Sequence, residues 1–413
     1  MSVLLKLPTR AERVAALKAE MRRVFDVPPG EVRVVISPYR ICPLGAHVDH
    51  QRGIVTGMAL DQAVLLAFAP APEKTRNRVV ARSLNFEHEV QFDLDSIPPA
   101  RPGDWGNYLR GAALALRQHC DGAIRRGISA VVDGQMPVGG LSSSAAVGVA
   151  YLLALEAAND LTVGIADNIE LDRAIENGYI GLNNGILDQS VILASQRDRL
   201  LSLDCATQQW QTITGPRRAA FAVLVFHSGI TESLMTTGYN QRVAECREAA
   251  QLLLSAARTP VPENTVLRDV PEEVFRQLGV TLPLPLRKRA THFFTEQARV
   301  RAGLEAWQAS DLTRFGQLVT QSGRSSMDNY ECGSPQLIAI YELLAVTPGV
   351  FGARFSGAGF RGSCIALVEP ARAVAIAAAV AEGYAQRHPA EAMRSALVLC
   401  DSDNGARLLG AGN

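Results

Sequence analysis

Residues 135–146 read QMPVGGLSSSAA, and this stretch decides the fold because it joins a short apolar run to a helix. Residues 128–132 before it predict a strand, and the alanine- and leucine-rich residues after it predict a helix to about residue 158. Gly139 and Gly140 let the backbone turn tightly and approach an anion, while the first N–H groups of the helix are unpaired donors. The layout predicts a phosphate-binding loop.

Three hydroxyl groups follow the glycines, on Ser142, Ser143 and Ser144. Hydroxyl oxygens bond phosphate and also ligate magnesium, which prefers oxygen donors. No P-loop lysine follows, so this is not a Walker motif. The alternative interpretation is an ordinary helix N-cap, where serine is common.

Composition limits the classes of protein to which the chain can belong. It has 413 residues, of which 47% are hydrophobic, so it can bury one or two cores. Its 41 basic and 41 acidic residues cancel, which argues against binding to nucleic acid or to an anionic membrane. An odd total of seven cysteines without a CxxC pair indicates free thiols, and no apolar run reaches the ~18 residues of a membrane span. We therefore expect a cytoplasmic protein.

Hydrophobic spacing predicts the first elements of the chain. Thr9 and Glu12 are spaced as a capping box at the start of an amphipathic helix. The β-branched residues 31–36 predict a strand that stops at Ser37 and Pro38. Residues 167–180 predict a further helix.

Two domains are expected, 1–205 and 206–413, with the boundary near Cys205. Helices should dominate residues 239–344, and the chain should end as strand, glycine loop, strand, helix and strand.

That second glycine loop, residues 357–362, reads GAGFRG and matches the dinucleotide fingerprint G-x-G-x-x-G. The fingerprint needs a helix directly after the glycines, whereas residues 364–368 read CIALV and predict a strand. A plain hairpin loop and a loop that lines a substrate site both remain open. A nicotinamide dehydrogenase would rest on this motif alone.

Two further stretches carry polar groups in apolar surroundings. Residues 37–51 read SPYRICPLGAHVDHQ, and a sugar with several hydroxyls needs mixed donors and acceptors such as Arg40, His47 and Asp49. Residues 175–189 read IENGYIGLNNGILDQ and contain Glu176 and Asp188. Carboxylates near a phosphate loop hold a metal or accept a proton. The alternatives are solvated loop residues in the first stretch, and a helix cap or a surface charge in the second.

Together and in this order, the four stretches resemble the galactokinase branch of the superfamily of galactokinase, homoserine kinase, mevalonate kinase and phosphomevalonate kinase, the GHMP kinases. The galactokinase patterns are roughly P-G-R-x-N-x-x-G-E-H-x-D-Y, P-x-G-x-G-L-S-S-S-A and G-A-G-F-G-G. This chain has PYRICPLGAHVDH, PVGGLSSSA and GAGFRG. The resemblance implies an α+β fold of two domains. The N-terminal one would hold a mixed sheet and the C-terminal one an antiparallel sheet covered by helices, with ATP and sugar meeting between them.

The resemblance also implies roles for individual residues. Asp188 matches the catalytic aspartate, and Arg40 matches the arginine that pairs with it. Ser144 and Glu176 match magnesium ligands. His47 and Asp49 match contacts to sugar hydroxyls.

The remaining implied contacts concern the nucleotide and the sugar pocket. The loop that would wrap the triphosphate comprises Pro137, Val138, Gly139, Gly140, Leu141, Ser142, Ser143, Ser144 and Ala145. Tyr239 matches a tyrosine of the sugar pocket. Trp105 corresponds either to an aromatic residue beside the adenine or to half of a core pair with Tyr108.

Two departures from the pattern point to the acceptor. Ala46 stands where galactokinases carry a glutamate that bonds the 6-hydroxyl, and Arg361 stands where they carry glycine. If C6 is a carboxylate, a glutamate about 4 Å away would repel it by ~1 kcal/mol in water and by about 4 kcal/mol at an effective dielectric of ~20. Alanine removes this repulsion, and a guanidinium can pair with a carboxylate.

These features, and a likeness to plant galacturonokinases in the same stretches, predict an ATP- and Mg²⁺-dependent sugar 1-kinase that acts on D-galacturonate. The alternatives are a galactokinase and a non-catalytic sugar sensor of the same fold. The expected partners are the sugar and ATP, without nucleic acid or membrane, and the expected state is a monomer or a weak homo-oligomer.

Overall fold

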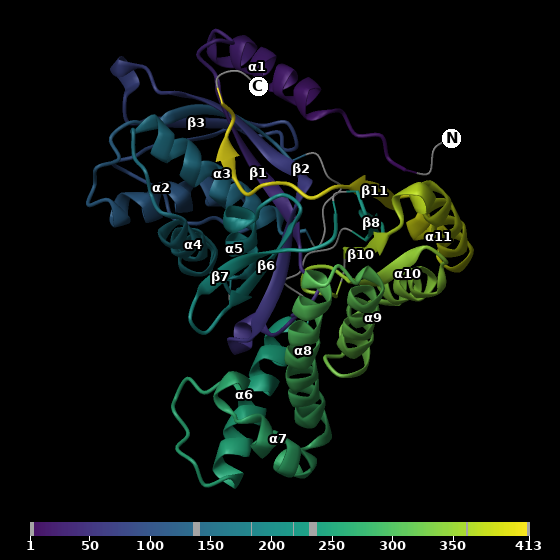
Figure 1. Cartoon of the computed structure of the whole chain (residues 1–413). Coiled ribbons are helices and arrows are strands. Elements are labelled where there is room, and N and C mark those ends of the chain that lie inside the picture. The colour runs from purple at the N-terminus through teal and green to yellow at the C-terminus, as the bar shows by residue number, and fades with distance from the viewer. Residues whose placement is uncertain are drawn as a thin grey trace.

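The chain forms two β-sheets, each covered by helices, as the computed structural model in Figure 1 shows. The structure describes residues 4–134, 141–182, 184–217, 219–230, 238–360 and 362–410, and only the backbone of Tyr239. The larger sheet is built mainly from the first half of the chain and is mixed, while the smaller sheet belongs to the second half and is antiparallel. The predicted α+β class is therefore confirmed.

The larger sheet has the strand order β12-β1-β2-β5-β3-β4, and β2 also pairs with β6 of a β6–β7 hairpin. Its neighbouring strands run antiparallel except β3 and β5, which run parallel. The strands are β1 (Arg33–Ile41), β2 (Ile54–Pro70), β3 (Arg78–Ser83), β4 (Val90–Asp93), β5 (Ile128–Asp133), β6 (Arg199–Asp204), β7 (Gln209–Thr214) and β12 (Arg407–Leu408).

Strand β1 does not stop at Ser37 and Pro38, so the predicted end of this strand was wrong. Pro38 pairs with Ala63 of β2, and the register shifts before Arg40. Proline cannot donate a ladder hydrogen bond, and an irregularity in the register is a place where a strand tolerates it. The strand consequently carries Arg40 into the interior of the molecule.

The two faces of the larger sheet bury alternate residues of β1. Val34 packs with Leu17 and Met21 of helix α1 (Arg10–Phe25), whereas Val35 belongs to the main core on the other face. Helix α1 begins with the predicted capping box of Thr9 and Glu12, which is confirmed.

The other face of the larger sheet is covered by a layer of helices, visible on the left of Figure 1. These are α2 (Asn107–His119), α3 (Ser143–Ala158), α4 (Ile165–Arg173) and α5 (Leu187–Ala194). The predicted helix 167–180 is α4 followed by a π-helical segment, η3 (Ala174–Ile180). A π-turn widens the helix and often marks a functional site.

The smaller sheet has the strand order β11-β8-β10-β9. These strands are β8 (Ala222–His227), β9 (Val350–Phe355), β10 (Ser363–Val368) and β11 (Ala396–Cys400). The GAGFRG loop links β9 to β10, so a strand follows the glycines and the predicted strand–loop–strand order is confirmed.

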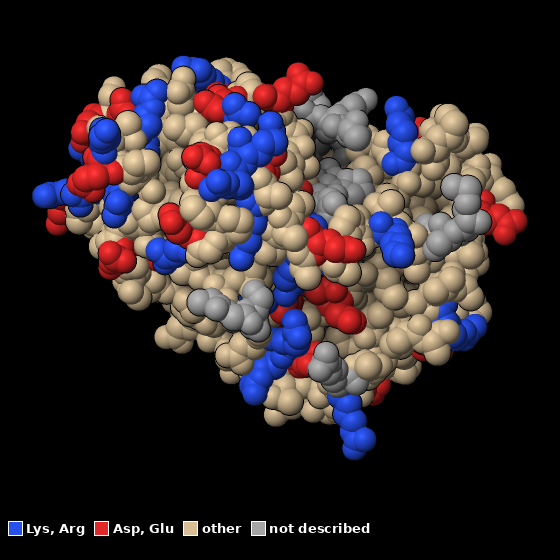
Figure 2. Space-filling model, turned by 90° about the horizontal axis from the view of Figure 1, so that it is seen from above, with Lys and Arg blue, Asp and Glu red and all other residues tan. Residues whose placement is uncertain are grey.

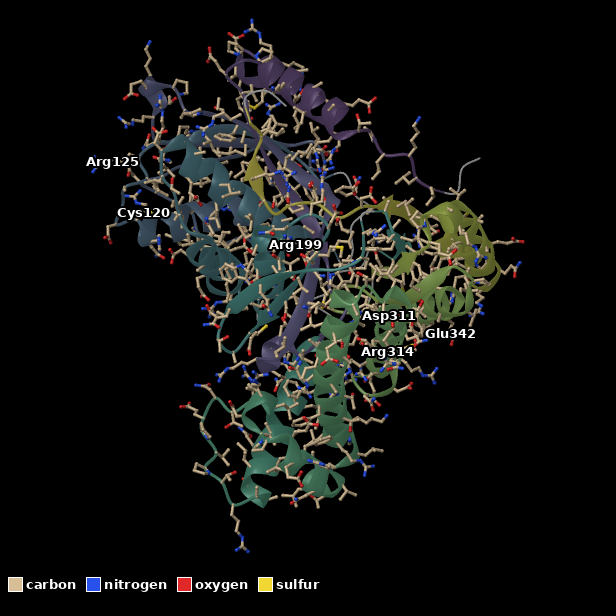
Figure 3. The ribbon with its side chains drawn as sticks, in the orientation of Figure 1. Cys120, Arg125, Arg199, Asp311, Arg314 and Glu342 are labelled. Carbon is tan, nitrogen blue, oxygen red and sulfur yellow. The ribbon has the colours of Figure 1, made fainter. Side chains whose placement is uncertain are left out.

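The second half of the chain contributes helices α6 to α12, of which α9, α10 and α11 contact the smaller sheet, while α6, α7 and α8 extend below it in Figure 1. They are α6 (Tyr239–Ala256), α7 (Glu272–Leu278), α8 (Leu284–Gln308), α9 (Leu312–Asp328), α10 (Pro335–Val346), α11 (Ala373–Arg387) and α12 (Pro389–Ala392). Short 3-10 turns are η1 (Asp49–Gln51), η2 (Glu73–Thr75), η5 (Leu267–Asp269), η6 (Gly279–Thr281) and η7 (Pro370–Arg372). Helix α9 starts at a cap in which the Asp311 carboxylate accepts from the Arg314 N–H over 2.9 Å, and Figure 3 labels both residues.

The two halves of the chain are joined by strands as well as by packing. Hairpin β6–β7 spans the predicted boundary at residue 205, and β12, almost at the end of the chain, pairs with β1. A single main hydrophobic core continues from one half into the other. We keep 1–205 and 206–413 as a proposed division into domains.

The face shown in Figure 2 carries basic and acidic side chains interspersed with one another. This agrees with the balanced composition of 41 basic and 41 acidic residues. Within the described residues, none of the helices has both the length and the apolar character that crossing a bilayer requires.

Candidate active site

Asp188 lies in the first turn of α5, and both of its carboxylate oxygens are engaged. Arg40 from β1 contacts Oδ1 through Nε and through Nη2, each at 2.7 Å, and the Ser142 hydroxyl donates to Oδ2 over 2.5 Å. Arg40 is 3% exposed, whereas the Asp188 side chain is 24% exposed. The carboxylate is thus the member of the ion pair that a substrate can reach, and two other elements fix its orientation.

Arg40 also presents a donor that has no partner. Its Nη1 atom is buried and makes no hydrogen bond within the described part of the chain. A buried unpaired N–H of a charged group is costly, and such groups in native structures need an explanation. A bound anionic oxygen beside Asp188 would satisfy this donor.

The phosphate loop adjoins this ion pair where it enters α3. The Leu141 carbonyl accepts from the Arg40 N–H at 3.4 Å, and Ser142 has a positive φ of 59° just before the helix. Ser143 and Ser144 form the first turn of α3, and Ala145 is fully buried. The other loop residues predicted to bind the nucleotide, Pro137, Val138, Gly139 and Gly140, lie outside the described residues.

Glu176 lies on the π-helical segment η3 and is 1% exposed. The Asn184 amide donates to Oε2 over 3.1 Å, while Oε1 has no hydrogen-bond partner among the described residues. Burial and the negative charge of Asp188 raise the pKa of Glu176, and hydrogen bonds with Ser144 and Asn184 oppose this rise. Ser144 and Glu176, the two predicted magnesium ligands, are therefore neighbours.

Asp172 is a second buried carboxyl group, one helical turn before Glu176. It is fully buried, and both of its oxygens lack hydrogen-bond partners in the described structure. Burial, with the charges of Glu176 and Asp188, raises its pKa well above the ordinary value, which favours its neutral form. Its Oδ1 atom packs against Gly148 of α3, where an added Cβ would come within 2.1 Å.

The loop between β1 and β2, residues 42–53, brings Asp49 close to Asp188; we call it the sugar loop. Burial and then the charge of Asp188 raise the pKa of Asp49 to about 6. Its carboxylate packs on the backbone just before α5, because a Cβ at Gly185 would lie 2.3 Å from Oδ2. The two polar stretches of the sequence, residues 37–51 and 175–189, thus lie next to each other in the structure.

His47 lies in the same loop and is enclosed by residues of the second half of the chain. Its ring stacks on Tyr330 at 4.3 Å, and its Nε2 atom lies 3.6 Å from the Cys332 sulfur. A Cβ at Gly359 of the GAGFRG loop would lie 3.2 Å from the His47 ring. Burial holds the pKa of His47 well below the ordinary value, so the imidazole is neutral. The GAGFRG loop is therefore packed against the sugar loop.

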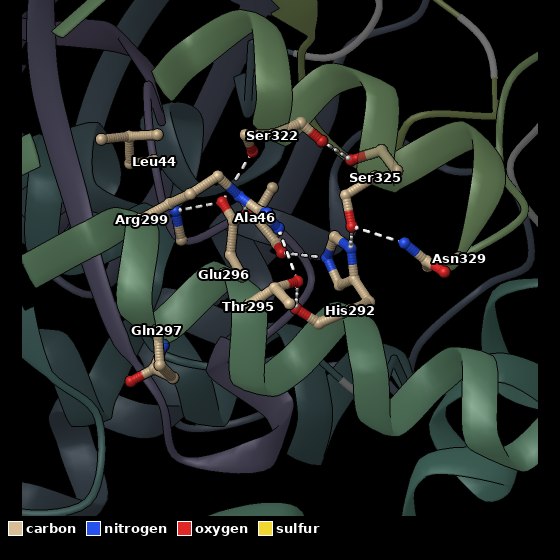
Figure 4. Close-up of polar contacts among 12 residues, drawn as sticks. Leu44, Ala46, His292, Thr295, Glu296, Gln297, Arg299, Ser322, Ser325 and Asn329 are labelled. Carbon is tan, nitrogen blue, oxygen red and sulfur yellow. Dashed lines mark hydrogen bonds and ion pairs between the residues drawn. The ribbon is translucent and has the colours of Figure 1, made fainter. Parts of the chain in front are cut away.

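Beneath the sugar loop, Glu296 of α8 is fully buried. Although burial alone would raise its pKa, Arg299, His292 and Arg354 lower it to about 2. Arg299 Nε donates to Oε2 over 2.7 Å, and the Ser322 hydroxyl donates to Oε1 over 2.6 Å. This carboxylate is accordingly ionised and fully paired (Figure 4).

Trp105 is 8% exposed, and its ring lies beside Phe86 at 6.2 Å and His88 at 5.6 Å. Its Nε1 atom makes no hydrogen bond in the described part of the chain. Burial raises the pKa of Tyr108 to about 12, and a hydrogen bond with Ser144 opposes this rise, so Tyr108 lies near Ser144.

The side chains of Tyr239 and Arg361, both predicted to contact the sugar, lie outside the described residues.

Sequence reasoning did not identify Asp172, Tyr330, His292 or Glu296. Asp172 had a signal, since it precedes Glu176 by four residues in a predicted helix and so shares its face. No local pattern in the sequence points to Tyr330, His292 or Glu296, because each contacts the sugar loop from more than 240 residues away along the chain.

Two family models match the chain. The GHMP kinases N terminal domain matches residues 107–196, and the GHMP kinases C terminal model matches residues 303–386. These matches contain α3, Glu176 and Asp188 in the first case, and α9 and the GAGFRG loop in the second.

Full-length relatives are also found. The galacturonokinase of Arabidopsis thaliana is 43% identical over 97% of this chain and 99% of its own length. The galactokinase of Chloroflexus aurantiacus is 33% identical over 91% of this chain and 93% of its own. The crystal structure of Lactococcus lactis galactokinase complexed with galactose superposes with a TM-score of 0.87 at 28% identity, covering 96% of this chain and 99% of that one.

Proposed function

Since the chain belongs to the GHMP kinase family, we propose that it transfers the γ-phosphoryl group of ATP to the 1-hydroxyl of D-galacturonate. The products are D-galacturonate 1-phosphate and ADP. Its relatives include a galacturonokinase at 43% identity and a galactokinase at 33% identity, so the acceptor class is a hexose or a hexuronic acid.

One observation carries the choice of acceptor: position 46 of the sugar loop is alanine, where galactokinases carry glutamate. A carboxylate on C6 would meet no opposing acid from this position. The nearby Glu296 adds little repulsion, because Arg299 and Arg354 balance its charge. Arg361, in place of a glycine, is the cation that we propose for pairing with the sugar carboxylate.

Asp188 is the proposed catalytic group. Arg40 and Ser142 hold its two oxygens, so the carboxylate can orient the anomeric hydroxyl or accept its proton without first reorganising. The buried Nη1 of Arg40 is the donor proposed for an oxygen of the transferred phosphoryl group. His47 and Asp49 are the proposed contacts to sugar hydroxyls, and Tyr239 is a further proposed wall of this pocket.

The triphosphate is proposed to lie over the loop 137–145 and the N-terminus of α3. The Ser142 side chain does not cap α3 within the described residues, the first N–H groups of a helix have no partner inside it, and the positive end of its dipole favours an anion there. Trp105 and the exposed Phe86 beside it are the proposed neighbours of the adenine.

The residues present also fit a magnesium ion. Glu176 offers a buried oxygen that has no hydrogen-bond partner among the described residues, and Ser144 adds a hydroxyl next to it, which are the hard oxygen donors that Mg²⁺ prefers. When bound, the ion would neutralise charge on the phosphate oxygens. We propose Ser144 and Glu176 as the residues that hold it.

The second candidate is a galactokinase, which the similarity to the galactose-bound structure favours. A coupled ADP-release assay with galacturonate, glucuronate, galactose and glucose separates the two. We expect kcat/KM for galacturonate to exceed that for galactose at least tenfold. Equal or better use of galactose would replace our acceptor, and no ADP release with any sugar would favour a non-catalytic sugar sensor.

We place the protein in the cytoplasm, because all seven cysteines are unpaired and a reducing compartment suits free thiols. We propose that it works as a monomer or a weak homo-oligomer, since one chain supplies Asp188, Arg40 and the sugar loop.

A further inference from the structure

The sugar loop has a left-handed backbone on both sides of position 46, a conformation that glycine adopts freely but histidine does not. Gly45 has a φ of 93° and His47 a φ of 60°, so both neighbours of Ala46 lie in the left-handed region. A histidine rarely adopts this region, and such strain persists only where the surroundings over-determine it. Something outside the loop must therefore hold residues 45–47 in place.

Helix α8 makes hydrogen bonds on both sides of position 46, as Figure 4 shows for Ala46. The Gly45 N–H donates to Glu296 Oε1 over 2.7 Å, and His292 Nε2 lies 3.0 Å from the Ala46 carbonyl. His292 and Glu296 are one turn apart, so they lie on the same face of the helix. The peptide before Gly45 and the peptide after Ala46 are thus tied to one rigid element.

The far end of the loop is tied to the same helix. Gln297 accepts from the Ile54 N–H at 2.8 Å and donates to the Ile54 carbonyl at 3.0 Å. Three residues on two consecutive turns of α8, His292, Glu296 and Gln297, consequently hold this loop. The helix belongs to the second half of the chain and the loop to the first.

The hydrogen-bond chain through His292 has a defined direction. A carbonyl only accepts, so Nε2 must carry the proton, and Nδ1 must then accept from the Ser325 hydroxyl at 3.0 Å. The Asn329 amide donates to the Ser325 oxygen over 3.1 Å, which leaves the hydroxyl proton free for His292. His292 is 1% exposed, and burial lowers its pKa, in agreement with a neutral ring.

We propose that His292 and Glu296 are positioning residues that set the sugar loop, and through Ala46 the choice of the C6 substituent, from helix α8. The inference rests on the proposed function in one respect, namely that the sugar loop contacts the acceptor. Neither residue touches the reacting atoms, and both act through the backbone of residues 45–47.

Two substitutions at position 292, to glutamine and to asparagine, differ by one methylene. They test the roles of the two ring nitrogens separately. His292→Gln places an amide N–H near the Nε2 position and can still donate to Ala46, whereas His292→Asn places its amide near Nδ1 and cannot reach. We expect His292→Asn to raise the KM for the sugar about tenfold or more, with kcat and the KM for ATP changed less than threefold. His292→Gln should remain within about threefold of wild type in all three constants.

The matched control is Glu305→Ala, because Glu305 is an exposed residue of the same helix. Hydrogen–deuterium exchange of the peptide covering residues 44–54 gives a second readout that needs no turnover. We expect faster exchange in His292→Asn than in His292→Gln and the control.

The proposal is overturned if His292→Asn keeps both the wild-type sugar KM and wild-type exchange of residues 44–54. It is also overturned if His292→Asn and His292→Gln lose function equally, or if the KM for ATP rises as much as that for the sugar. The assay uses whichever hexose the wild-type enzyme phosphorylates best. A preference for galactose would therefore sink the proposed acceptor while leaving this test intact.

Discussion

The sugar loop and helix α3 each pack on a fully buried carboxyl group, and the pKa values of the two groups shift in opposite directions. Glu296, under the sugar loop, has a pKa lowered to about 2 because Arg299, His292 and Arg354 outweigh its burial. Asp172, which packs against Gly148 of α3, has a raised pKa because burial and two acidic neighbours act on it together. Burial is the same in both, so the partners decide the charge.

The difference suits what each region has to do. An ionised Glu296 can accept several hydrogen bonds and hold a loop. A protonated Asp172 adds no further negative charge beside Glu176 and Asp188, where two carboxylates already lie near the proposed position of the triphosphate.

The largest expected effect comes from Asp188, the partly exposed acid that Arg40 and Ser142 hold. Asp188→Asn keeps the shape of the side chain but removes its ability to accept a proton, so we expect kcat to fall by about 10³-fold. Steady-state ADP release measures this, with the exposed Asp328→Asn on α9 as the control. A fall below tenfold would exclude Asp188 as the catalytic group.

Adding an acid to the sugar side tests the acceptor. In Ala46→Glu, repulsion of about 4 kcal/mol at an effective dielectric of ~20 would lower kcat/KM for galacturonate by roughly 10²- to 10³-fold. Galactose turnover should stay equal or improve. If both sugars respond alike in the same assay, position 46 does not sense C6.

Removing the charge under the sugar loop should cost stability. Glu296→Gln leaves the buried Arg354 without its anion, and we expect a loss of about 3 kcal/mol in the free energy of unfolding at pH 7. Because the pKa of Glu296 is lowered to about 2, its contribution is full above pH 4.5 and is lost as the pH falls toward 2. Urea unfolding at pH 7 and pH 3 should show the gap between variant and wild type shrinking on acidification.

The smallest effect is expected at Asp172. Its raised pKa means that folding takes up a proton, so wild-type stability declines as the pH rises from about 4. Asp172→Asn has no proton to take up and should be at least as stable as wild type at pH 7, with no difference near pH 4. Urea unfolding of the two proteins at both pH values checks this, and a clear destabilisation at pH 7 would show that an ionised Asp172 holds the fold.

The sequence alone was sufficient to predict elements that depend only on neighbouring residues. Strand β5 and helix α3, on either side of the glycine–serine stretch, follow from hydrophobic spacing, and the capping box of α1 follows from the spacing of Thr9 and Glu12. The family resemblance brought Arg40 and Asp188 together, although 148 residues separate them.

The rest depends on tertiary context that no local pattern carries. A proline is expected to end a strand, yet β1 continues through Pro38 because a shift in register accommodates it beside β2. The π-turn that presents Glu176 has no simple periodicity. The hold of α8 on the sugar loop links positions about 250 residues apart, where only the packed structure shows the contact.

Strand β12 pairs with Val35 and Ile36 of β1, the strand that carries Arg40. Just before β12, the fully buried Asp403 forms ion pairs with Arg10, Arg197 and Arg407. Residues 403–408 are thus bound to two segments of the first half of the chain. Until residues 407–408 pair with it, this part of β1 presents unpaired backbone donors and acceptors. Removal of residues 403–409 would therefore expose backbone groups of β1 and leave Arg10 and Arg197 without their shared carboxylate.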